Sequence, residues 1–559
     1  MADTEQSAAP PSGPTFFARN ATGLVREIRI RDATILNALP GVPGVVLAVS
    51  IFWILSAFPG ANLYLAMLIA AVGAFLVIGA FGLLSQVMPR TGGDYILVSR
   101  SLNPVLGFVS SVLVAASALL AVAFWGVVSA SLLVSPLFTY LGLKTGSATL
   151  TNWGVDLTKT PETFIFGIVL TLAVFLLIGL GKRFMQRVQL AMYAFGMLGL
   201  VVAAVILLTT SRGHFISTFN AFAHPYTHRA DSYSYFLSQG AAVGVQTNTG
   251  INWAHTIFGS AAILSFTVWT WWSVCYAGEL RQASTRRNWY SMIGGLALTF
   301  IPVVLMIAIM NSTFGTAFLP SLSAVSSNTH VYSLPVTPLW IVFVAMIHPA
   351  WGLVVFLGLA FVMWGVLQVY VNAIYPSRTI FAWAFDQIIP AKLSAVSGRR
   401  NTPVAALTLL AALTVLLCWW AAYTTSFFRF LTLDIVLIFP AFALVGISAI
   451  VLPRRQRRLY DASSARLNLL GVPLVALFGV GAIAVATFMA YCYFTQAPLG
   501  LPGAGKSIGS QLFTSPSNGG LALLAVFIIA SLIFYGVAWL IRRSEGIDLS
   551  LAGMELPPE

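Results

Sequence analysis

Apolar stretches separated by short polar ones run through most of the chain. Stretches long enough to span a membrane occur at 33–58, 62–88, 104–138, 162–181, 188–209, 257–278, 289–311, 350–375, 404–423, 428–452, 471–495 and 519–541. An α-helix of about 20 apolar residues crosses the hydrocarbon core of a bilayer. The pattern therefore predicts an all-α polytopic membrane protein with about 12 transmembrane helices.

The composition agrees with that class. The 559 residues are 58% hydrophobic and only 8% charged, which leaves no stretch for a water-soluble catalytic domain. Cys275, Cys418 and Cys492 all fall in apolar stretches, where they are expected as small buried residues rather than as metal ligands or a disulfide. We therefore expect no metal and no cofactor.

The basic residues predict the orientation in the membrane. All but six of the 29 lysines and arginines fall in segments that are cytoplasmic if the N-terminus is inside. The positive-inside rule thus explains the net charge of +13 without a nucleic-acid partner. We expect a multi-pass protein of the cytoplasmic membrane, in contact with lipid, without a cleaved signal, and with residues 1–32 and the tail 544–559 both in the cytoplasm.

Two long polar insertions are predicted as external loops, at 210–256 and 312–349. Together they hold all six histidines, so the side chains that an intramembrane enzyme would need lie outside the membrane and no enzyme is expected. Residues 338–348 in the second insertion are apolar but too short to span. They are predicted to form a lid or an interfacial helix.

The first span contains an unusual interruption. Residues 37–45 carry two Pro-Gly pairs, and the apolar part that follows, 45–58, is only 14 residues and covers about 21 Å. Proline and glycine break helices, and irregular backbone inside a membrane survives only where protein buries it or where it lines a cavity. The pattern predicts a broken helix at a binding site; the alternative is a surface turn before a short span.

Several segments resemble the signatures of one transporter family. These are residues 88–108, residues 375–390 followed by 401–404, and residues 276–280 with the basic run to Arg287. They are similar to the amino acid, polyamine and organocation (APC) superfamily, in its amino-acid permease branch. The resemblance implies a secondary active transporter for amino acids that works by alternating access.

The resemblance also implies the fold and the site. It implies a five-plus-five inverted repeat, with spans 1–5 in 33–209 and spans 6–10 in 257–452, interrupted helices 1 and 6, and spans 11 and 12 in 453–543. The substrate carboxylate would meet free amides of span 1, and span 6 and the long third span would supply the rest of the pocket. The expected substrate-binding residues are Gly41, Val42, Gly44, Val45, Phe266, Thr267, Trp269, Thr270 and Trp125.

Span 6 departs from the family because the usual glycine at its break is missing. Ordinary helix packing of Phe266, Thr267, Trp269 and Thr270 is therefore the alternative to a pocket role. No second acidic residue lies at the middle of spans 1, 3, 6 or 8, which favours neutral, apolar or aromatic amino acids as substrates.

Four charged residues are candidates for coupling or gating. Asp434, with Arg429 above it, is an intramembrane carboxylate that we interpret as a carrier for a coupling proton or an outer-gate partner; a local structural pair is the alternative. Arg378 and Asp386 are expected to pair with neighbouring cytoplasmic loops when the inner gate is shut, or else to be topology-fixing surface charges.

The coupling ion and two other functions stay open at this point. Span 8 lacks the serine or threonine of sodium-coupled relatives, and span 5 lacks the lysine of some proton-coupled ones. A transporter-like amino-acid sensor, or a permease for another small amine or organic cation, are the alternatives to an amino-acid permease.

Overall fold

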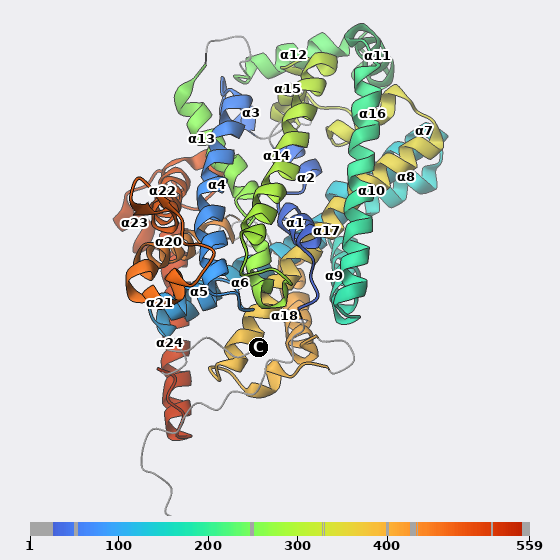
Figure 1. Cartoon of the computed structure of the whole chain (residues 1–559). Coiled ribbons are helices and arrows are strands. Elements are labelled where there is room, and N and C mark those ends of the chain that lie inside the picture. The colour runs from blue at the N-terminus through green and yellow to red at the C-terminus, as the bar shows by residue number, and fades with distance from the viewer. Residues whose placement is uncertain are drawn as a thin grey trace, which may run out of the picture.

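Helices make up nearly all the regular structure of the chain (Figure 1). The computed structural model describes residues 26–49, 54–245, 251–326, 328, 330–397, 402–424, 432, 434–515 and 518–550. Arg429 lies outside these residues, and of Val45 only the backbone is described. Within them the strands are β1 (Asn468–Leu469) and β2 (Val472–Pro473), which form one antiparallel hairpin.

Among the described residues, 11 helices are long and apolar enough to cross a membrane. Eight of them are single helices: α4 (Leu63–Val87), α9 (Thr160–Gly179), α10 (Lys182–Leu208), α14 (Arg286–Phe314), α17 (Trp351–Phe385), α18 (Val404–Tyr423), α22 (Leu474–Thr495) and α24 (Gly520–Ser544). Two are composite: one joins α6 (Pro104–Val128), the π-helical turn η2 (Ser129–Val134) and α7 (Ser135–Thr145), and the other joins α13 (Trp253–Thr267) and the 3₁₀-helix η3 (Trp272–Glu279). The last is the span Asp434–Arg455, which contains α20 (Ile438–Arg455). These helices confirm the predicted all-α polytopic class.

The first span is divided into α1 (Ile30–Ala38), α2 (Pro43–Val49) and the short α3 (Leu55–Ala57). Residues 39–42 are not helical, and residues 39–44, which contain both Pro-Gly pairs, are called the first break below. Pro40 has no amide to donate, whereas Pro43 stands at the first position of α2, where a missing amide costs nothing. The predicted interruption of helix 1 is confirmed.

Span 6 is interrupted as well, although it has no glycine there. The α-helix ends at Thr267, residues 268–271 form turns, and a 3₁₀-helix continues from Trp272. The Trp269 indole Nε1 donates to the Ser265 carbonyl at 2.6 Å, the acceptor that the Trp269 amide would use in a continued α-helix. Residues 268–271 are called the second break.

Two short helices show that the halves of the fold are inverted. Helix α5 (Asp94–Ser101) precedes the long α6, and α16 (Trp340–Ile347) precedes the long α17. Figure 1 places α5 toward the lower end of the bundle and α16 toward the upper end. The same sequence of short helix and long span thus starts from opposite sides, as an inverted repeat requires.

The polar insertions are largely helical rather than extended loops. They contain α11 (Arg212–Thr227), α12 (Ser232–Ala242) and α15 (Phe318–Val325), which lie at the upper end in Figure 1. All eight residues of α16 are buried, and it packs against α10, α11 and α17, so the predicted interfacial placement of residues 338–348 is wrong. The remaining short helices are α8 (Ala148–Asp156), η4 (Ala391–Ser394), α21 (Arg457–Asp461), η5 (Ala497–Leu499) and α23 (Ile508–Leu512).

Candidate functional site

The two breaks are joined by one side chain. Asn37, in the last turn of α1, is fully buried, and its Oδ1 accepts a hydrogen bond from the Ser273 amide at 2.8 Å. Its Nδ2 donates to Ser291 Oγ on α14 at 3.2 Å. The Asn37 side-chain oxygen therefore replaces the backbone acceptor that the Ser273 amide would have in an unbroken span 6.

Helix α17 supports both breaks from one side. Gln368 Nε2 donates to the carbonyl of Pro40 in the first break at 2.9 Å, and Asn372 donates in turn to the Gln368 side chain at 3.2 Å. The Trp272 indole, just after the second break, donates to the Val371 carbonyl at 2.8 Å. The bond from Gln368 satisfies a carbonyl of the first break that would otherwise be unpaired in the membrane interior, and the bond to Val371 gives the buried Trp272 indole an acceptor.

The amides of the first break differ from one another. The Val42 amide donates to the Leu39 carbonyl at 3.2 Å, so it is a weaker candidate for the substrate carboxylate than predicted. Gly41 and Gly44 have no backbone acceptor among the described residues. The backbone of Val45 lies in the first turn of α2, whose N-terminal end favours negative charge.

Both glycines of the first break are tightly packed. A Cβ on Gly41 would lie 2.7 Å from Thr299 Cγ2, and a Cβ on Gly44 would lie 2.4 Å from Trp364 Cδ1. Neither contact is tolerated without movement of α14 or of the rigid indole. The glycines of the two Pro-Gly pairs therefore serve close helix packing.

The second break carries buried hydroxyls without partners. Thr270 Oγ1 and Ser273 Oγ are buried and accept or donate no hydrogen bond within the described part of the chain. Such groups are rare in native proteins and call for an explanation. By contrast, the Thr267 hydroxyl donates to the Ile263 carbonyl at 2.9 Å and is satisfied within its own helix.

The aromatic candidates lie in different surroundings. Trp269 is half-buried, and its ring meets that of Trp272 at 5.3 Å, while Phe266 is half-buried against the core. Trp125 is 7% exposed on α6; its ring meets Phe124, its carbonyl accepts the Ser129 hydroxyl, and none of these contacts involves either break. Trp269 is thus part of the second break, whereas the ring contact and hydrogen bond of Trp125 lie within α6 and η2.

Buried charges tie the helices together below the second break. Glu279, at the end of η3, pairs with Lys182 Nζ at 2.6 Å and with Arg378 Nε at 3.0 Å, and all three side chains are at most 2% exposed. The guanidinium of Arg378 also lies 4.5 Å from the centre of the Tyr276 ring. Arg378 is thus a buried ion-pair residue, and the alternative of a topology-fixing surface charge is wrong for it.

A second buried pair joins α5 to the end of α17. Arg100 Nη2 lies 2.7 Å from Asp386 Oδ2, and the Tyr95 hydroxyl donates to the same oxygen at 2.6 Å. The side chain of Asp386 is 1% exposed, so the surface-charge alternative is wrong here too. Both clusters lie near the C-terminal end of α17.

Asp94 is a third buried group of this region, and it lacks a cation. Its Oδ1 accepts from the Tyr375 hydroxyl at 2.8 Å and its Oδ2 from Ser110 Oγ at 2.5 Å, and no basic side chain lies within ion-pair distance among the described residues. Burial raises the pKa of Asp94 from its usual value to about 6, although the hydrogen bonds from Ser110 and Tyr375 offset part of the rise. Tyr375 in turn contacts Trp272 at 4.5 Å, which connects Asp94 to the second break.

Asp434 is connected to the second break by a different set of residues. It begins the span Asp434–Arg455, and its Oδ1 is buried with no hydrogen-bond partner among the described residues. It is close enough to interact electrostatically with Tyr493 on α22, whose hydroxyl shares a 2.5 Å hydrogen bond with Ser265 Oγ. Ser265 also supplies the carbonyl that the Trp269 indole occupies.

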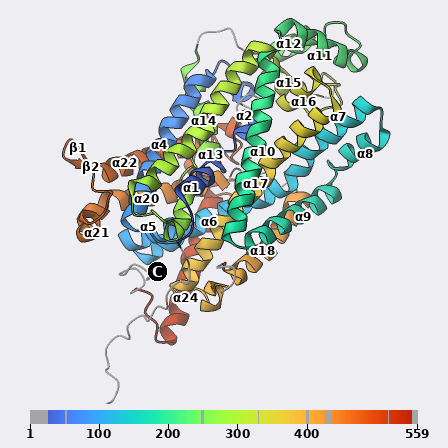
Figure 2. The ribbon, with the colours of Figure 1, turned by 45° about the vertical axis from the view of Figure 1, so that its right-hand side comes forward.

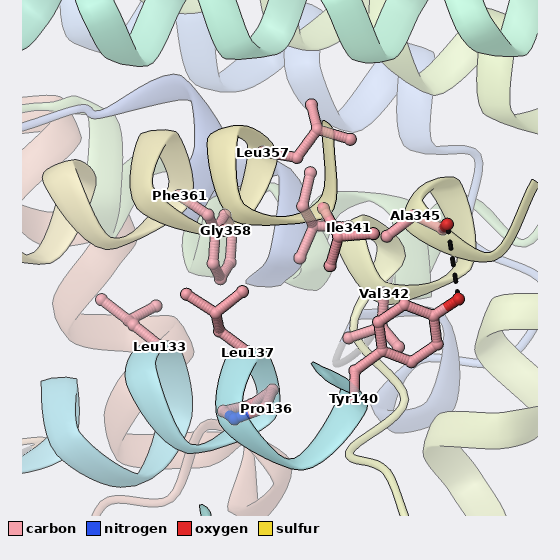
Figure 3. A pocket seen from close by; sticks show the side chains of 11 residues that line it. Leu133, Pro136, Leu137, Tyr140, Ile341, Val342, Ala345, Leu357, Gly358 and Phe361 are labelled. Atoms are coloured by element: carbon pink, nitrogen blue, oxygen red, sulfur yellow. Dashed lines mark hydrogen bonds between the residues drawn. The ribbon is translucent and has the colours of Figure 1, made fainter. Parts of the chain in front are cut away.

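A separate cavity lies between α7, α16 and α17 (Figure 3). Its walls are almost entirely apolar, with the Tyr140 hydroxyl donating to the Ala345 carbonyl at 3.4 Å. A volume of about 20 Å³ holds no more than a water-sized molecule. This cavity is therefore too small to be the substrate site.

Sequence reasoning missed three polar residues that organise the site. Asn37 stands three positions before Pro40 of the first Pro-Gly pair, and Gln368 and Asn372 are amides in the middle of an apolar span. An amide in such a place is costly unless it is bonded, and this signal could have identified all three. Ser273 is a polar residue within span 6, but nothing in the sequence indicates that its amide bonds a residue 236 positions away.

Comparisons with known proteins agree with this geometry. The family model of amino acid permeases matches residues 33–527. Solved structures of similar fold include MhsT in complex with L-phenylalanine, with a TM-score of 0.55 and 14% identity, covering 84% of this chain and 99% of that one. A search of the curated proteins finds no match. The chain belongs to the amino acid permease family of the APC superfamily.

Proposed function

We propose that this transporter moves neutral amino acids, with an apolar or aromatic side chain, across the cytoplasmic membrane by alternating access. The observation that carries the proposal is the pairing of the two breaks. One break offers the amides of Gly41 and Gly44, and the other offers the buried hydroxyls of Thr270 and Ser273. An amino acid has a carboxylate and an ammonium group that would satisfy these two sets of partners.

The surroundings of the breaks favour an uncharged side chain. The residues that contact them, Asn37, Thr299, Trp364 and Gln368, carry no charge. Trp269 and Trp272 add aromatic surface. The phenylalanine bound to MhsT, which shares the fold, is a ligand of the same class.

The buried charge clusters would form the closed inner gate. Glu279, Arg378 and Asp386 connect η3, α10, α17 and α5 with no exposed side chain among them. Opening a path to the cytoplasm requires these ion pairs to separate or to move together as a unit. This inner-gate role is the one that we assign to Arg378 and Asp386. In this orientation both termini lie on the cytoplasmic side.

Asp434 is our candidate for the coupling proton. Its buried oxygen has no described partner, and the path through Tyr493 and Ser265 leads to the second break. Uptake that depends on external pH in the wild type but not in Asp434→Asn is expected. Uptake by Asp434→Asn with the wild-type pH profile would exclude this role.

The function is tested by uptake into liposomes that contain the purified full chain. Labelled phenylalanine and leucine should accumulate saturably, whereas lysine and putrescine should not compete. Preferential uptake of lysine or putrescine would overturn the proposed substrate class and favour a permease for other amines. Saturable binding of phenylalanine without uptake would overturn transport and favour an amino-acid sensor.

A further inference from the structure

A hairpin at the edge of the bundle exposes apolar side chains. Strands β1 and β2 connect the end of the span Asp434–Arg455 to the start of α22, and Figure 2 shows them projecting beside α21 and α22. Leu470 at the turn is 96% exposed, and Leu469 beside it is 54% exposed. If water surrounded the hairpin tip, exposure of these apolar side chains would be unfavourable in free energy.

The backbone of the same tip is also unfavourable. Leu470 has φ +51° and Gly471 φ +80°, so both residues of the two-residue turn are left-handed. Glycine and asparagine are the usual residues for such a turn, and a leucine pays a steric cost there. A residue that is both strained and exposed indicates that the tip has a role outside the fold.

A basic groove lies next to this hairpin. It has a volume of about 420 Å³ and is lined by Arg454, Arg457, Arg466, Asp461 and Tyr460 together with Asn468 of β1 and the prolines Pro453 and Pro473. Asp461 is the one acidic side chain of the lining, and it is shared between Arg457 at 3.4 Å and Arg466 at 3.6 Å. Arg454 has no carboxylate within ion-pair distance among the described residues. The groove therefore attracts anions.

The groove and the hairpin lie at the depth where hydrocarbon gives way to headgroups. The apolar span ends at Arg455 and the next begins at Leu474, and the hairpin base is closed by a hydrogen bond from the Leu474 amide to the Leu467 carbonyl at 2.7 Å. A phospholipid has its phosphate at the level of the headgroups and its acyl chains in the hydrocarbon next to it. One phospholipid could therefore contact both the basic groove and the apolar hairpin tip.

We propose that this groove binds the phosphate of an anionic phospholipid while Leu470 inserts among the acyl chains of the same leaflet. The arginines neutralise the headgroup, and the strained leucine is compensated by burial in lipid. The hairpin and groove together thus anchor the end of the tenth span to the membrane surface. A free phosphate would use the arginines but not Leu470.

The test uses the full chain in nanodiscs of phosphatidylcholine with and without phosphatidylglycerol. The unfolding midpoint and the phospholipid retained in native mass spectrometry are measured. Arg454→Gln should weaken phosphatidylglycerol binding about fivefold without breaking an ion pair. Asp461→Asn should strengthen it. Arg287→Gln should leave it unchanged, because Arg287 is exposed on the same side and, among the described residues, bonds the Gln282 side chain alone.

Leu470→Asn separates the two halves of the proposal. Asparagine tolerates the left-handed backbone, so the variant should be at least as stable as the wild type in detergent. In nanodiscs of either composition it should gain less stability over detergent than the wild type does, since both phospholipids supply acyl chains. Equal lipid stabilisation in Leu470→Asn and wild type would overturn the insertion of the tip.

Two further results would overturn lipid binding itself. One is an effect of Arg287→Gln as large as that of Arg454→Gln, since the groove would then be no more than part of the general basic surface. The other is full stabilisation of the detergent-solubilised chain by inorganic phosphate or glycerol phosphate, since the ligand would then be a soluble anion.

Discussion

The two breaks reach the same geometry by different physical means. In span 1 the covalent structure of Pro40 and Pro43 excludes a continuous helix. In span 6 every residue is able to continue a helix, and the interruption comes from side chains that take over backbone partners: the Trp269 indole occupies the Ser265 carbonyl, and Asn37 occupies the Ser273 amide. The first break follows from the local sequence alone, whereas the second combines a local contact, Trp269 with Ser265, and a distant one, Ser273 with Asn37.

The inner ends of the two spans also differ in the interactions that attach them to the rest of the fold. The inner part of span 6 ends at Glu279, which is fixed by two buried cations. The inner part of span 1 is attached to it by backbone hydrogen bonds, from the Ile28 amide to the Glu279 carbonyl and from the Arg281 amide to the Ile28 carbonyl, both at 3.1 Å. The two half-helices are therefore expected to move as one unit, with span 6 supplying the stronger attachment.

The largest effect is expected when the attachment of span 6 is removed. Glu279→Gln leaves Lys182 and Arg378 buried without their carboxylate, at a cost of about 3–5 kcal/mol. We expect a lower unfolding midpoint and faster labelling of Cys275, which is buried in η3, in a chain whose other two cysteines are alanine. Glu27→Gln is the matched control, because its partner Arg183 is 77% exposed and such a pair contributes less than about 1 kcal/mol. Equal effects of the two substitutions would contradict the comparison.

The pH dependence of stability tests whether the buried Asp94 carboxyl, which Tyr375 connects to the second break, changes its protonation near neutral pH. Its pKa is raised in the folded state to about 6 from 3.8, so the native protein holds its proton over that range while the unfolded chain has lost it. The contribution of Asp94 to the free energy of unfolding is therefore highest below about pH 4. It falls by about 3 kcal/mol in total as the pH rises to about 6 and is then constant. Asp94→Asn should remove this fall from the pH profile of the unfolding midpoint. A variant that retains the full slope would show that another group is responsible.

Packing around the first break is tested by adding one methyl group. Gly44→Ala forces a Cβ against Trp364, and overpacking of this kind costs about 1–3 kcal/mol. Gly352→Ala is the control, since nothing lies within 4 Å of that helical position and alanine should stabilise it by up to about 1 kcal/mol. Trp364→Phe should partly rescue Gly44→Ala. The same unfolding midpoint for both alanine variants would refute close packing at the first break.

The smallest effect is expected at the indole of the second break. Trp269→Phe keeps an aromatic ring but releases the Ser265 carbonyl, a change of about 1 kcal/mol. Amide hydrogen exchange at residues 268–271 should become slower, as the helix extends by a turn, while exchange at residues 39–42 is unchanged. Unaltered exchange in span 6 would mean that the indole does not cause the break.

The sequence predicted those features that depend on local chemistry. The apolar spans and the first break follow from composition and from the Pro-Gly pairs, and both are confirmed. The bond between Asn37 and Ser273, which contributes to the second break, and the burial of Arg378 and Asp386 depend on residues far apart in the chain, which only the packed fold brings together. The polar insertions were predicted as loops because their composition is polar, yet α11, α12 and α15 are helices covered by their own aromatic side chains, such as Phe219 and Phe318.

The central claim is that the two breaks form one amino-acid site, and the hydroxyl of Thr270 tests it most directly. Phenylalanine affinity of the purified chain is measured by equilibrium binding for wild type, Thr270→Val and Thr267→Val. If the ligand ammonium bonds Thr270 Oγ1, its loss should weaken binding about tenfold or more, while the unliganded protein becomes no less stable because a buried unpaired hydroxyl is removed. Thr267→Val, whose hydroxyl already bonds the Ile263 carbonyl, should bind phenylalanine like the wild type. Unchanged affinity in Thr270→Val, or the same loss in both variants, would contradict the account.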